Sequence, residues 1–325
     1  MAPAGDHQAP GRALVSVCVV TFNHERYIQD CLRSVLAQLG DAELEILVGD
    51  DGSTDATRPM LAALAAEFPQ VHVFNRDRNL GPIGNLLDLL QRTTGQYICH
   101  LDGDDLWLPG KLREQLRLME DPAVSAVYTN AIVYDDQREP VGIFSNAKAG
   151  SYDRAALLER GNFLNHSSLL YRARDRLSVL AMPAPFIDFR IHLMLAGKGE
   201  LRYTSKVLAG YRQGAVGSML ATANAAVREQ YWEAVVANLS ADDPVRLRVA
   251  AGSDFLRRVV FRAIRTRTLG LAVQWWATVR RDLRVSGAAL LASVIAGCIA
   301  EAGRQGYQWL AMRMRRRGTR ILYFR

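Results

Sequence analysis

The 325-residue sequence lacks a hydrophobic run long enough to mark a membrane-spanning helix. Its uncharged, mostly apolar segment Val285–Ala300 has 16 residues, whereas a spanning helix needs roughly 20. The sequence also lacks the apolar core of a secretory signal peptide, because Met1–Arg12 is polar and rich in proline and glycine. We therefore expect residues 1–12 to form a disordered leader and the chemistry to be cytoplasmic.

Cysteine is scarce, and no two cysteines have the spacing of a metal site or a redox motif. Three of the four lie in apolar surroundings. We expect them to be small buried side chains in a reducing compartment. The four cysteines are Cys18, Cys31, Cys99 and Cys298.

Two nucleotide-binding signatures are absent after the first predicted strand, Leu14–Val20. There is no G-x-G-x-x-G run and no P-loop lysine. These absences disfavour a dinucleotide-dependent dehydrogenase and a P-loop kinase. The length is sufficient for about two domains with a sizeable core.

Positive charge is concentrated in the last quarter of the chain. Ala251–Arg325 contains 15 Lys and Arg against 3 Asp and Glu, whereas the whole chain has a net charge of +7. The first 250 residues are therefore acidic, which counts against a nucleic-acid-binding protein, because phosphate backbones require a basic face.

The most informative stretch is an apolar run, Tyr97–Leu101, that ends in three acids, Asp102, Asp104 and Asp105. We expect the run to be a buried strand and the acids to follow its carboxyl end, where open α/β sheets bind ligands. Mg²⁺ or Mn²⁺ would relieve the repulsion between the carboxylates. The alternative is a solvated acidic turn.

Earlier segments alternate strand and helix patterns, which predicts a Rossmann-like parallel sheet with right-handed connections. A second pair of acids, Asp50 and Asp51, ends the strand Leu44–Gly49. A capping or turn role is the alternative for Asp50 or Asp55. The predicted strands are 14–20, 44–49, 71–74, 97–101, 125–134 and 201–212.

Several polar residues further along the chain have two interpretations. Asp188 begins a helical pattern, 186–195, and could be an acid favoured there by the helix dipole or a functional group. We interpret His100 and His192 as packed histidines. His166-Ser167-Ser168 fits either an acceptor-facing segment or a turn entering a strand.

The motifs, in their order and spacing over about residues 14–215, resemble the family-2 glycosyltransferases. Members of that family are GT-A-fold, usually inverting enzymes. The matching elements are Thr21-Phe22-Asn23, Asp50-Asp51-Gly52-Ser53-Thr54-Asp55, Asn79-Leu80-Gly81, Asp102-Gly103-Asp104-Asp105, Asp188 and Tyr211-Arg212.

The resemblance implies a site residue by residue. Thr21, Asn23 and Asp51 would line the nucleotide pocket, and Asn79 and Gly81 would approach the donor from the third loop. Asp102 and Asp104 resemble the D-x-D element that holds Mn²⁺ or Mg²⁺ and the nucleotide-sugar, with Asp104 the stronger metal ligand. Asp188 falls at the general base. These roles involve Thr21, Asn23, Asp51, Asn79, Gly81, Asp102, Asp104 and Asp188.

The chain departs from the family pattern at three points. Ile187 stands where many relatives have Glu before the base, and Gln213 replaces the usual histidine after Tyr211-Arg212. The Gln-x-x-Arg-Trp element of processive synthases is missing, which favours transfer of a single sugar. By resemblance, residues 13–225 form a GT-A catalytic domain, α/β with a mostly parallel sheet flanked by helices.

We therefore expect a metal-dependent, inverting, hexosyltransferase-like enzyme that uses a nucleotide-diphosphate sugar, most readily a UDP-sugar. Its acceptor would be a glycan or lipid-linked hydroxyl in bacterial cell-surface polysaccharide or glycolipid synthesis. One alternative is a sugar nucleotidyltransferase, although Thr21–Glu25 is not the Gly-rich basic loop of that class. Another is a non-enzymatic nucleic-acid binder that uses the basic tail.

Residues 226–325 form a predicted helical, basic region. Phe255, Leu256, Val259, Val260, Ala263 and Ile264 recur at helical spacing, with Arg257, Arg258, Arg262 and Arg265 opposite. Trp275, Trp276, Trp309, Arg313, Arg315, Arg316 and Arg317 complete the pattern. This pattern predicts peripheral attachment to the inner face of the cell membrane. The alternative is a soluble helical subdomain that packs Val285–Ala300 against the catalytic domain and leaves the arginine face solvated.

Overall fold

The computed structural model describes residues 12–214 and 224–314, and from residue 304 onward it describes the backbone alone. Residues 1–11 of the predicted leader, Trp309, Arg313 and Arg315–Arg317 therefore lie outside the residues or side chains described. The chain divides into two compact units. Unit 1 holds residues 12–131, Asn165–Met182 and Lys206–Tyr211, and unit 2 holds the rest. The predicted domain boundary at residue 225 stays a prediction.

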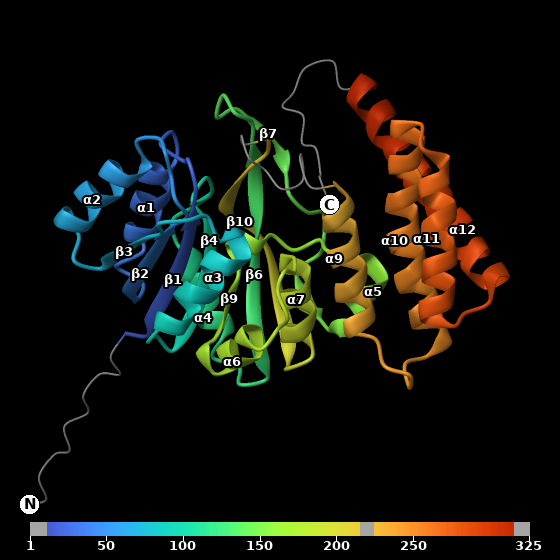
Figure 1. The fold of residues 1–325 in the computed structure, drawn as a ribbon, viewed down its shortest axis with the longest axis horizontal. Helices are drawn as coiled ribbons and strands as arrows, with labels where there is room; N and C mark the ends of the chain where they lie inside the picture. The colour runs from blue at the N-terminus through green and yellow to red at the C-terminus, as the bar shows by residue number, and fades with distance from the viewer. Residues whose placement is uncertain (1–11, 215–223, 315–325) are drawn as a thin grey trace, which may run out of the picture. The chain divides into compact units, whose positions relative to one another are not determined.

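The parallel part of the sheet lies in unit 1 (Figure 1). Its strand order is β3-β2-β1-β4, and Val19 of β1 pairs with Val48 of β2 and with Leu101 of β4. Crossover helices join the strands, as parallel pairing requires. The elements are β1 (Leu14–Thr21), α1 (Ile28–Leu36), β2 (Glu43–Asp50), α2 (Thr57–Glu67), β3 (Val71–Asn75), α3 (Gly81–Arg92) and β4 (Tyr97–Asp102).

Beyond β4 the sheet continues as β9-β6-β10-β5, with antiparallel pairing of β4 to β9, of β9 to β6 and of β10 to β5. The predicted α/β sheet is thus present, but it is mixed and not mostly parallel, because the parallel pairings among β1, β2, β3 and β4 are joined by antiparallel pairings of β5, β7, β8 and β9. Two short strands pair outside this path, β7 with β6 and β8 with β10. The elements are β5 (Leu106–Trp107), α4 (Lys111–Leu118), β6 (Val124–Tyr134), β7 (Pro140–Ile143), β8 (Gly150–Tyr152), β9 (Leu170–Arg172), α6 (Arg176–Leu180) and β10 (Glu200–Arg212).

The core of unit 1 explains the uninterrupted apolar runs of its central strands. Val17, Val19 and Ile46 are fully buried, and they pack with Ile28 and Leu32 of α1. A strand covered by helices on both faces has no polar side. The strands predicted over 14–20 and 44–49 are therefore confirmed as β1 and β2.

One helix begins earlier than the sequence pattern indicates. The sequence pattern predicts a helix over Asn85–Arg92, but α3 begins at Gly81, which has a positive φ of 75°, and Pro82 occupies its first turn. Proline suits that position because its missing N–H has no helical partner there. Gly81 therefore lies where the loop after β3 ends and α3 begins.

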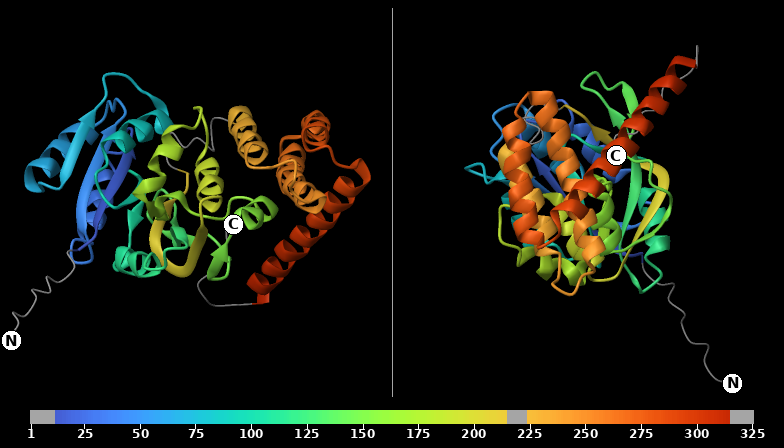
Figure 2. Two further views of the ribbon diagram at one scale, coloured as in Figure 1. Left: turned by 90° about the horizontal axis from the view of Figure 1, so that it is seen from below. Right: turned by 90° about the vertical axis from the view of Figure 1, so that its right-hand side faces the viewer.

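Unit 2 contains a helical cluster in which α10 packs against α5, α11 and α12 (Figure 2). Its aromatic core includes Phe255 of α10, whose ring lies 4.9 Å from Trp232 and 4.8 Å from Trp275. The helices are α5 (Arg154–Arg160), α7 (Asp188–Ala196), α9 (Asn224–Ala237), α10 (Val245–Thr266), α11 (Leu269–Leu283) and α12 (Gly287–Met314).

The apolar face of α10 that the sequence assigned to a membrane surface is part of this core. Phe255, Leu256, Val259 and Ala263 are at most 2% exposed, and Arg257 and Arg258 pair with Asp254. This face of α10 is therefore closed within unit 2, whereas Leu291, Ile295 and Ile299 of the segment Val285–Ala300 are exposed. Among the described helices, none combines the length and hydropathy needed to cross a bilayer.

Lys111, at the start of α4, is fully buried in unit 1. Its ammonium lies 3.8 Å from the centroid of the Trp107 ring and donates to Gln115 Oε1 at 2.7 Å. Burial lowers the pKa of Lys111 to about 8. Because the folded-state pKa is below the unfolded value, the folded protein gains stability as the pH rises from about 8 toward the pKa of an exposed lysine.

We expect Lys111→Met to remove this pH dependence. Relative to the variant, the wild type should gain on the order of 2 kcal/mol of unfolding free energy between pH 7 and pH 10. Urea unfolding of both proteins at each pH measures the difference, and titrations common to both cancel. Lys198→Met, at an exposed lysine, controls for the loss of charge. A wild-type-minus-variant difference that stays constant with pH would contradict the linkage.

Candidate active site

The loops that follow β1 and β2 hold each other through reciprocal hydrogen bonds. The Asn23 N–H donates to Ser53 Oγ at 2.8 Å, and the Thr54 N–H donates back to Asn23 Oδ1 at 2.8 Å. Asn23 has a positive φ of 55°, a conformation that asparagine tolerates better than most residues. The side-chain oxygen of Asn23 therefore joins the two loops at the edge of the sheet where the parallel strands end.

Thr21 ends β1 and contacts the acidic loop directly. Its side chain is 3% exposed, and a Cβ atom on Gly103 would lie 2.8 Å from Thr21 Oγ1 and 2.9 Å from His24 Nδ1. The Gly103 N–H donates to the Val20 carbonyl at 2.8 Å. The glycine between Asp102 and Asp104 is thus required for this close approach.

The two acids after β2 have different surroundings. Asp50 is fully buried and accepts hydrogen bonds from Arg58 Nε at 2.7 Å and the Ser53 N–H at 3.1 Å. These contacts match the turn role that the sequence left open for Asp50. Asp51 instead reaches the third loop, where its Oδ1 accepts from the Leu80 N–H at 2.7 Å.

The electrostatic environment separates Asp51 from Asp55. Burial raises the pKa of Asp51, and the N–H groups of Leu80 and Gly81 only partly oppose this effect. At Asp55 burial also favours a higher pKa, but hydrogen bonds from Thr57 and Glu25 outweigh this effect and lower the pKa. A ligand hydroxyl that donates to Asp51 would stabilise its charged form, whereas Asp55 is already satisfied within the loop.

Asn79 and Gly81 both lie in the third loop. Asn79 is exposed, and its Oδ1 accepts from the Gly81 N–H at 2.9 Å. Nothing lies within 4 Å of the position that a Cβ on Gly81 would occupy, so this face of the loop is open. The predicted donor-site residues thus lie at the carboxyl ends of β1, β2 and β4 or between β3 and the first residue of α3, all within unit 1.

The three acids after β4 divide into one buried and two half-buried side chains. Asp105 is 3% exposed and accepts from Ser167 Oγ at 2.5 Å, while Asp102 and Asp104 are half-buried. Ser167 also accepts from the Asp102 N–H at 3.2 Å and, through its carbonyl, from Trp107 Nε1 at 2.9 Å. Ser167 therefore fixes the acidic loop, a role that the sequence analysis missed.

The acids create a concentrated negative field. Burial, followed by the charges of Asp105, Asp104 and Asp102, raises the pKa of the Cys31 thiol well above its usual range. Two half-buried carboxylates one residue apart provide the oxygen donors that Mg²⁺ and Mn²⁺ prefer. The residues present therefore fit a hard divalent cation.

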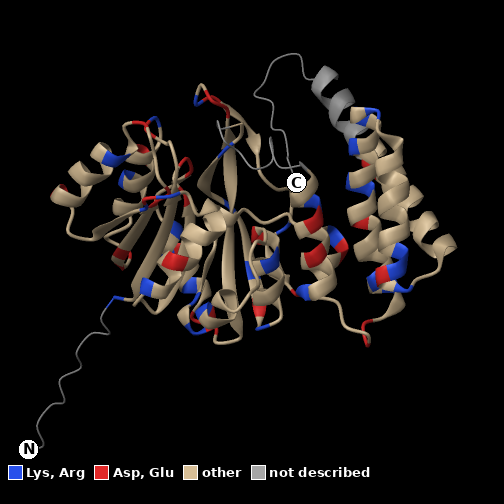
Figure 3. Ribbon diagram, in the orientation of Figure 1, with Lys and Arg blue, Asp and Glu red and all other residues tan. Residues whose placement is uncertain are grey.

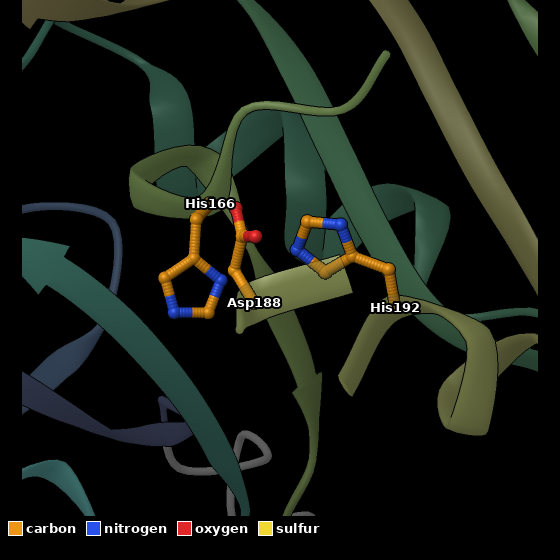
Figure 4. A group of neighbouring side chains, drawn as sticks. All are labelled: His166, Asp188 and His192. Carbon is orange, nitrogen blue, oxygen red and sulfur yellow. The ribbon is translucent and has the colours of Figure 1, made fainter. Parts of the chain in front are cut away.

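Asp188 lies in unit 2 as the first residue of α7 (Figure 4). Its Oδ1 accepts from the Phe189 N–H at 2.7 Å, and Asn162 Nδ2 lies 3.4 Å from its Oδ2. One turn later, the buried His192 places Nδ1 3.1 Å from Asn162 Oδ1. Asp188 therefore has the helix-start position that its alternative interpretation required, together with a polar neighbourhood.

Asn162 is a second residue that the sequence analysis missed. Its N–H donates to the Tyr231 hydroxyl of α9 at 3.2 Å, and the preceding Gly161 has a positive φ of 71°. A Cβ on Gly161 would lie 2.3 Å from Asp254 Oδ2 of α10. The C-terminal helices thus hold the segment that contacts Asp188.

The predicted packed histidines are both buried. His100 is 1% exposed and lies 3.2 Å from His166 Nε2 and 3.1 Å from the Tyr171 hydroxyl, all within unit 1. His166, which is drawn in Figure 4, also belongs to unit 1. It is half-buried, and its ring lies beside that of His100. His100 is therefore a packed residue with hydrogen-bond partners.

A cavity of about 680 Å³ lies at the edge of the sheet where β1 and β4 begin, opposite the end that carries Asp102 and Asp104. Its lining includes Glu120, Ala13, which precedes β1, and Gln96 and Tyr97 at the start of β4. Ligands of open α/β sheets bind at the carboxyl ends of the strands. This cavity therefore does not coincide with the acidic loops.

Comparison with known proteins identifies related sequences. The sequence model described as Glycosyl transferase family 2 matches residues 16–176. An uncharacterized protein of Mycobacterium tuberculosis is 30% identical over 210 residues, which cover 62% of this chain and 60% of the relative. The chain thus spans about 60% of that relative's length.

Two further relatives have descriptive names. The putative teichuronic acid biosynthesis glycosyltransferase TuaG of Bacillus subtilis is 32% identical over 145 residues, covering 44% of this chain and 57% of TuaG. WfaP of Escherichia coli, a UDP-Glc:α-D-GlcNAc-diphosphoundecaprenol β-1,3-glucosyltransferase, is 29% identical over 203 residues, covering 61% of this chain and 77% of WfaP.

Among solved structures, S. aureus TarS residues 1–349, in complex with UDP-GlcNAc, superposes with a TM-score of 0.62. The superposition covers 90% of this chain and 92% of that one, at 18% sequence identity. This likeness shows a shared fold.

Proposed function

The chain belongs to the family 2 glycosyl transferases through residues 16–176, and on this premise we propose that it transfers a single sugar from a nucleotide-diphosphate sugar to an acceptor hydroxyl with inversion. One observation carries the proposal. Asp51 follows β2, and Asp102 and Asp104 lie at the end of β4; these carboxyl ends flank that of β1, the strand between them, where a donor with a diphosphate can be held.

Donor recognition would use the loop contacts described above. Asp51 would accept a hydrogen bond from the nucleoside, which favours the charged state that burial disfavours. Thr21 and Asn23 would bound the same pocket, and Asn79 and Gly81 would present the exposed third loop. A UDP-sugar is the donor that we propose.

Asp102 and Asp104 would hold Mg²⁺ or Mn²⁺. A bound divalent cation neutralises charge on the departing nucleoside diphosphate. The chain's own contribution is to fix the two carboxylates, because Ser167 holds Asp105 and the Asp102 backbone while Gly103 packs on Thr21. A rigid ligand pair needs no reorganisation when the donor binds.

Asp188 would act as the general base. It would take the proton from the acceptor hydroxyl as that oxygen attacks the anomeric carbon from the face opposite the leaving group, which inverts the configuration. The Phe189 N–H holds one carboxylate oxygen, and Asn162 lies against the other. These contacts restrict the orientation of the carboxylate.

We propose a lipid-linked or glycan acceptor in bacterial cell-surface polysaccharide or glycolipid synthesis. The support is that TuaG is named for teichuronic acid biosynthesis and WfaP for a diphosphoundecaprenol acceptor. A lipid-linked acceptor would require the enzyme at the inner face of the membrane. We therefore retain peripheral association through the C-terminal helical region as part of the proposal.

Thermal shift with UDP-, GDP- and dTDP-sugars, compared with nucleoside triphosphates and oligonucleotides, tests the donor class. We expect a UDP-sugar with Mn²⁺ to raise the melting temperature of the wild type and of Glu120→Ala, but not of Asp51→Ala, because binding to the folded state alone stabilises it. Release of nucleoside diphosphate then identifies the sugar.

Two outcomes would overturn the proposal. Stabilisation by a nucleoside triphosphate with pyrophosphate release would indicate the nucleotidyltransferase alternative. Stabilisation by oligonucleotides alone would indicate a nucleic-acid-binding protein.

A further inference from the structure

The first four turns of α12 carry no charged side chain, and one side of them is packed. Leu290 is fully buried and Val294 is 7% exposed, and the helix packs against α10. On the other side, Leu291, Ile295 and Ile299 are 49%, 50% and 68% exposed. We call these three residues, spaced four apart, the outer face of α12.

Every exposed residue of α12 from Ala288 to Ala300 is alanine, leucine or isoleucine. A helix of a water-surrounded domain normally presents a polar face to solvent. The neighbouring α11 does so, because Gln274, Arg280 and Arg281 are exposed beside Val273. A continuous apolar strip of this kind marks an interaction surface.

The surroundings of the strip are basic. Between residues 245 and 303 the chain has ten arginines against three acids, a net charge of +7 (Figure 3). Arg280, Arg281 and Arg284 are exposed at the end of α11, directly before α12. A Cβ on Gly287 would lie 3.1 Å from Arg280 Nε, so this guanidinium lies against the first turn of α12.

We propose that the outer face of α12 lies on an anionic lipid surface. Its leucine and isoleucine side chains enter the boundary between headgroups and acyl chains, and Arg280, Arg281 and Arg284 contact the headgroups. The uncharged segment is too short to span a bilayer, which agrees with a helix that lies in the membrane plane. The inference rests on the proposed membrane location and assigns the surface that makes the contact.

This assignment differs from the one that the sequence pattern suggested. Periodicity pointed to Phe255, Leu256 and Val259 of α10, which the structure buries in the core of unit 2. Charge complementarity favours anionic lipid over a second copy of the chain, because two copies would bring like-charged arginine clusters together. A second copy is therefore an outcome that the test must detect.

The test is vesicle flotation of the full chain with phosphatidylglycerol-containing and pure phosphatidylcholine vesicles at low salt. We expect the wild type to bind the anionic vesicles. Ile295→Glu should lower the partition coefficient at least about tenfold, because a charge replaces aliphatic groups that would enter the lipid. Leu177→Glu in α6 is the matched control, since Leu177 is 69% exposed in unit 1. It should bind as the wild type does.

The outcomes separate this inference from the function on which it rests. If the wild type binds and Ile295→Glu binds equally, another surface contacts the lipid and the outer face of α12 is excluded. If Ile295→Glu instead converts a dimer to a monomer in light scattering without changing vesicle binding, the face joins two copies. If the wild type fails to bind, the membrane location itself is wrong, while donor-dependent thermal shift still tests the transferase.

Discussion

Asp104→Ala is expected to abolish sugar transfer. The side chain is half-buried beside Asp102 at the end of β4, where the pair would hold the cation that offsets charge on the leaving diphosphate. Losing that charge stabilisation, which is worth several kcal/mol, should lower turnover by about 10³-fold or more. Removal of divalent cations from the wild type with a chelator should have the same effect, and added Mn²⁺ should restore it.

The control is Glu120→Ala, which removes an exposed acid at the other edge of the sheet. It should retain wild-type activity and the wild-type response to chelator. Full wild-type activity in excess chelator would exclude the metal role of Asp102 and Asp104. The acidic loop would then be the solvated turn that the sequence left as an alternative.

Asp188→Asn is expected to slow transfer while leaving donor binding nearly intact. The substitution keeps the shape of the side chain and removes its basicity, so turnover should fall on the order of 10² to 10⁴-fold. A general base acts on the acceptor hydroxyl, so removing its basicity takes no hydrogen bond from the donor. Donor affinity, measured by titration calorimetry, should therefore change little.

Asp242→Asn removes an exposed carboxylate in unit 2 and should behave as the wild type. A collapse of donor affinity in Asp188→Asn would make Asp188 a binding or structural residue. Unchanged turnover would leave it the helix-start acid that the dipole favours.

The α/β fold could be predicted because local patterns and tertiary structure agree. The strands of unit 1 are apolar runs such as Val17–Val19, and helices buried on one face separate them. Short strands such as β5 and β7 were missed because two to four residues carry too little pattern. The GT-A fold that the sequence resemblance implied is confirmed by the likeness to TarS.

The sequence by itself determined where the acids would gather, because carboxyl ends of neighbouring parallel strands meet at one edge of a sheet. Local pattern does not separate Asp50 from Asp51 or Asp105 from Asp104, since adjacent residues of one type have the same pattern, and only the family resemblance favoured Asp51 and Asp104. That choice depends on distant partners, namely Leu80 for Asp51 and Ser167 for Asp105.

The same limit applies to the C-terminal helices. Composition determined that they are basic and amphipathic, but periodicity says only that a face is apolar and leaves open what covers it. Tertiary packing decides this, since Phe255 is buried beside Trp232 and Trp275, whereas Ile295 of α12 is left 50% exposed. Burial is a property of contacts between segments far apart in the chain, and for that reason only the folded structure reveals the outer face of α12.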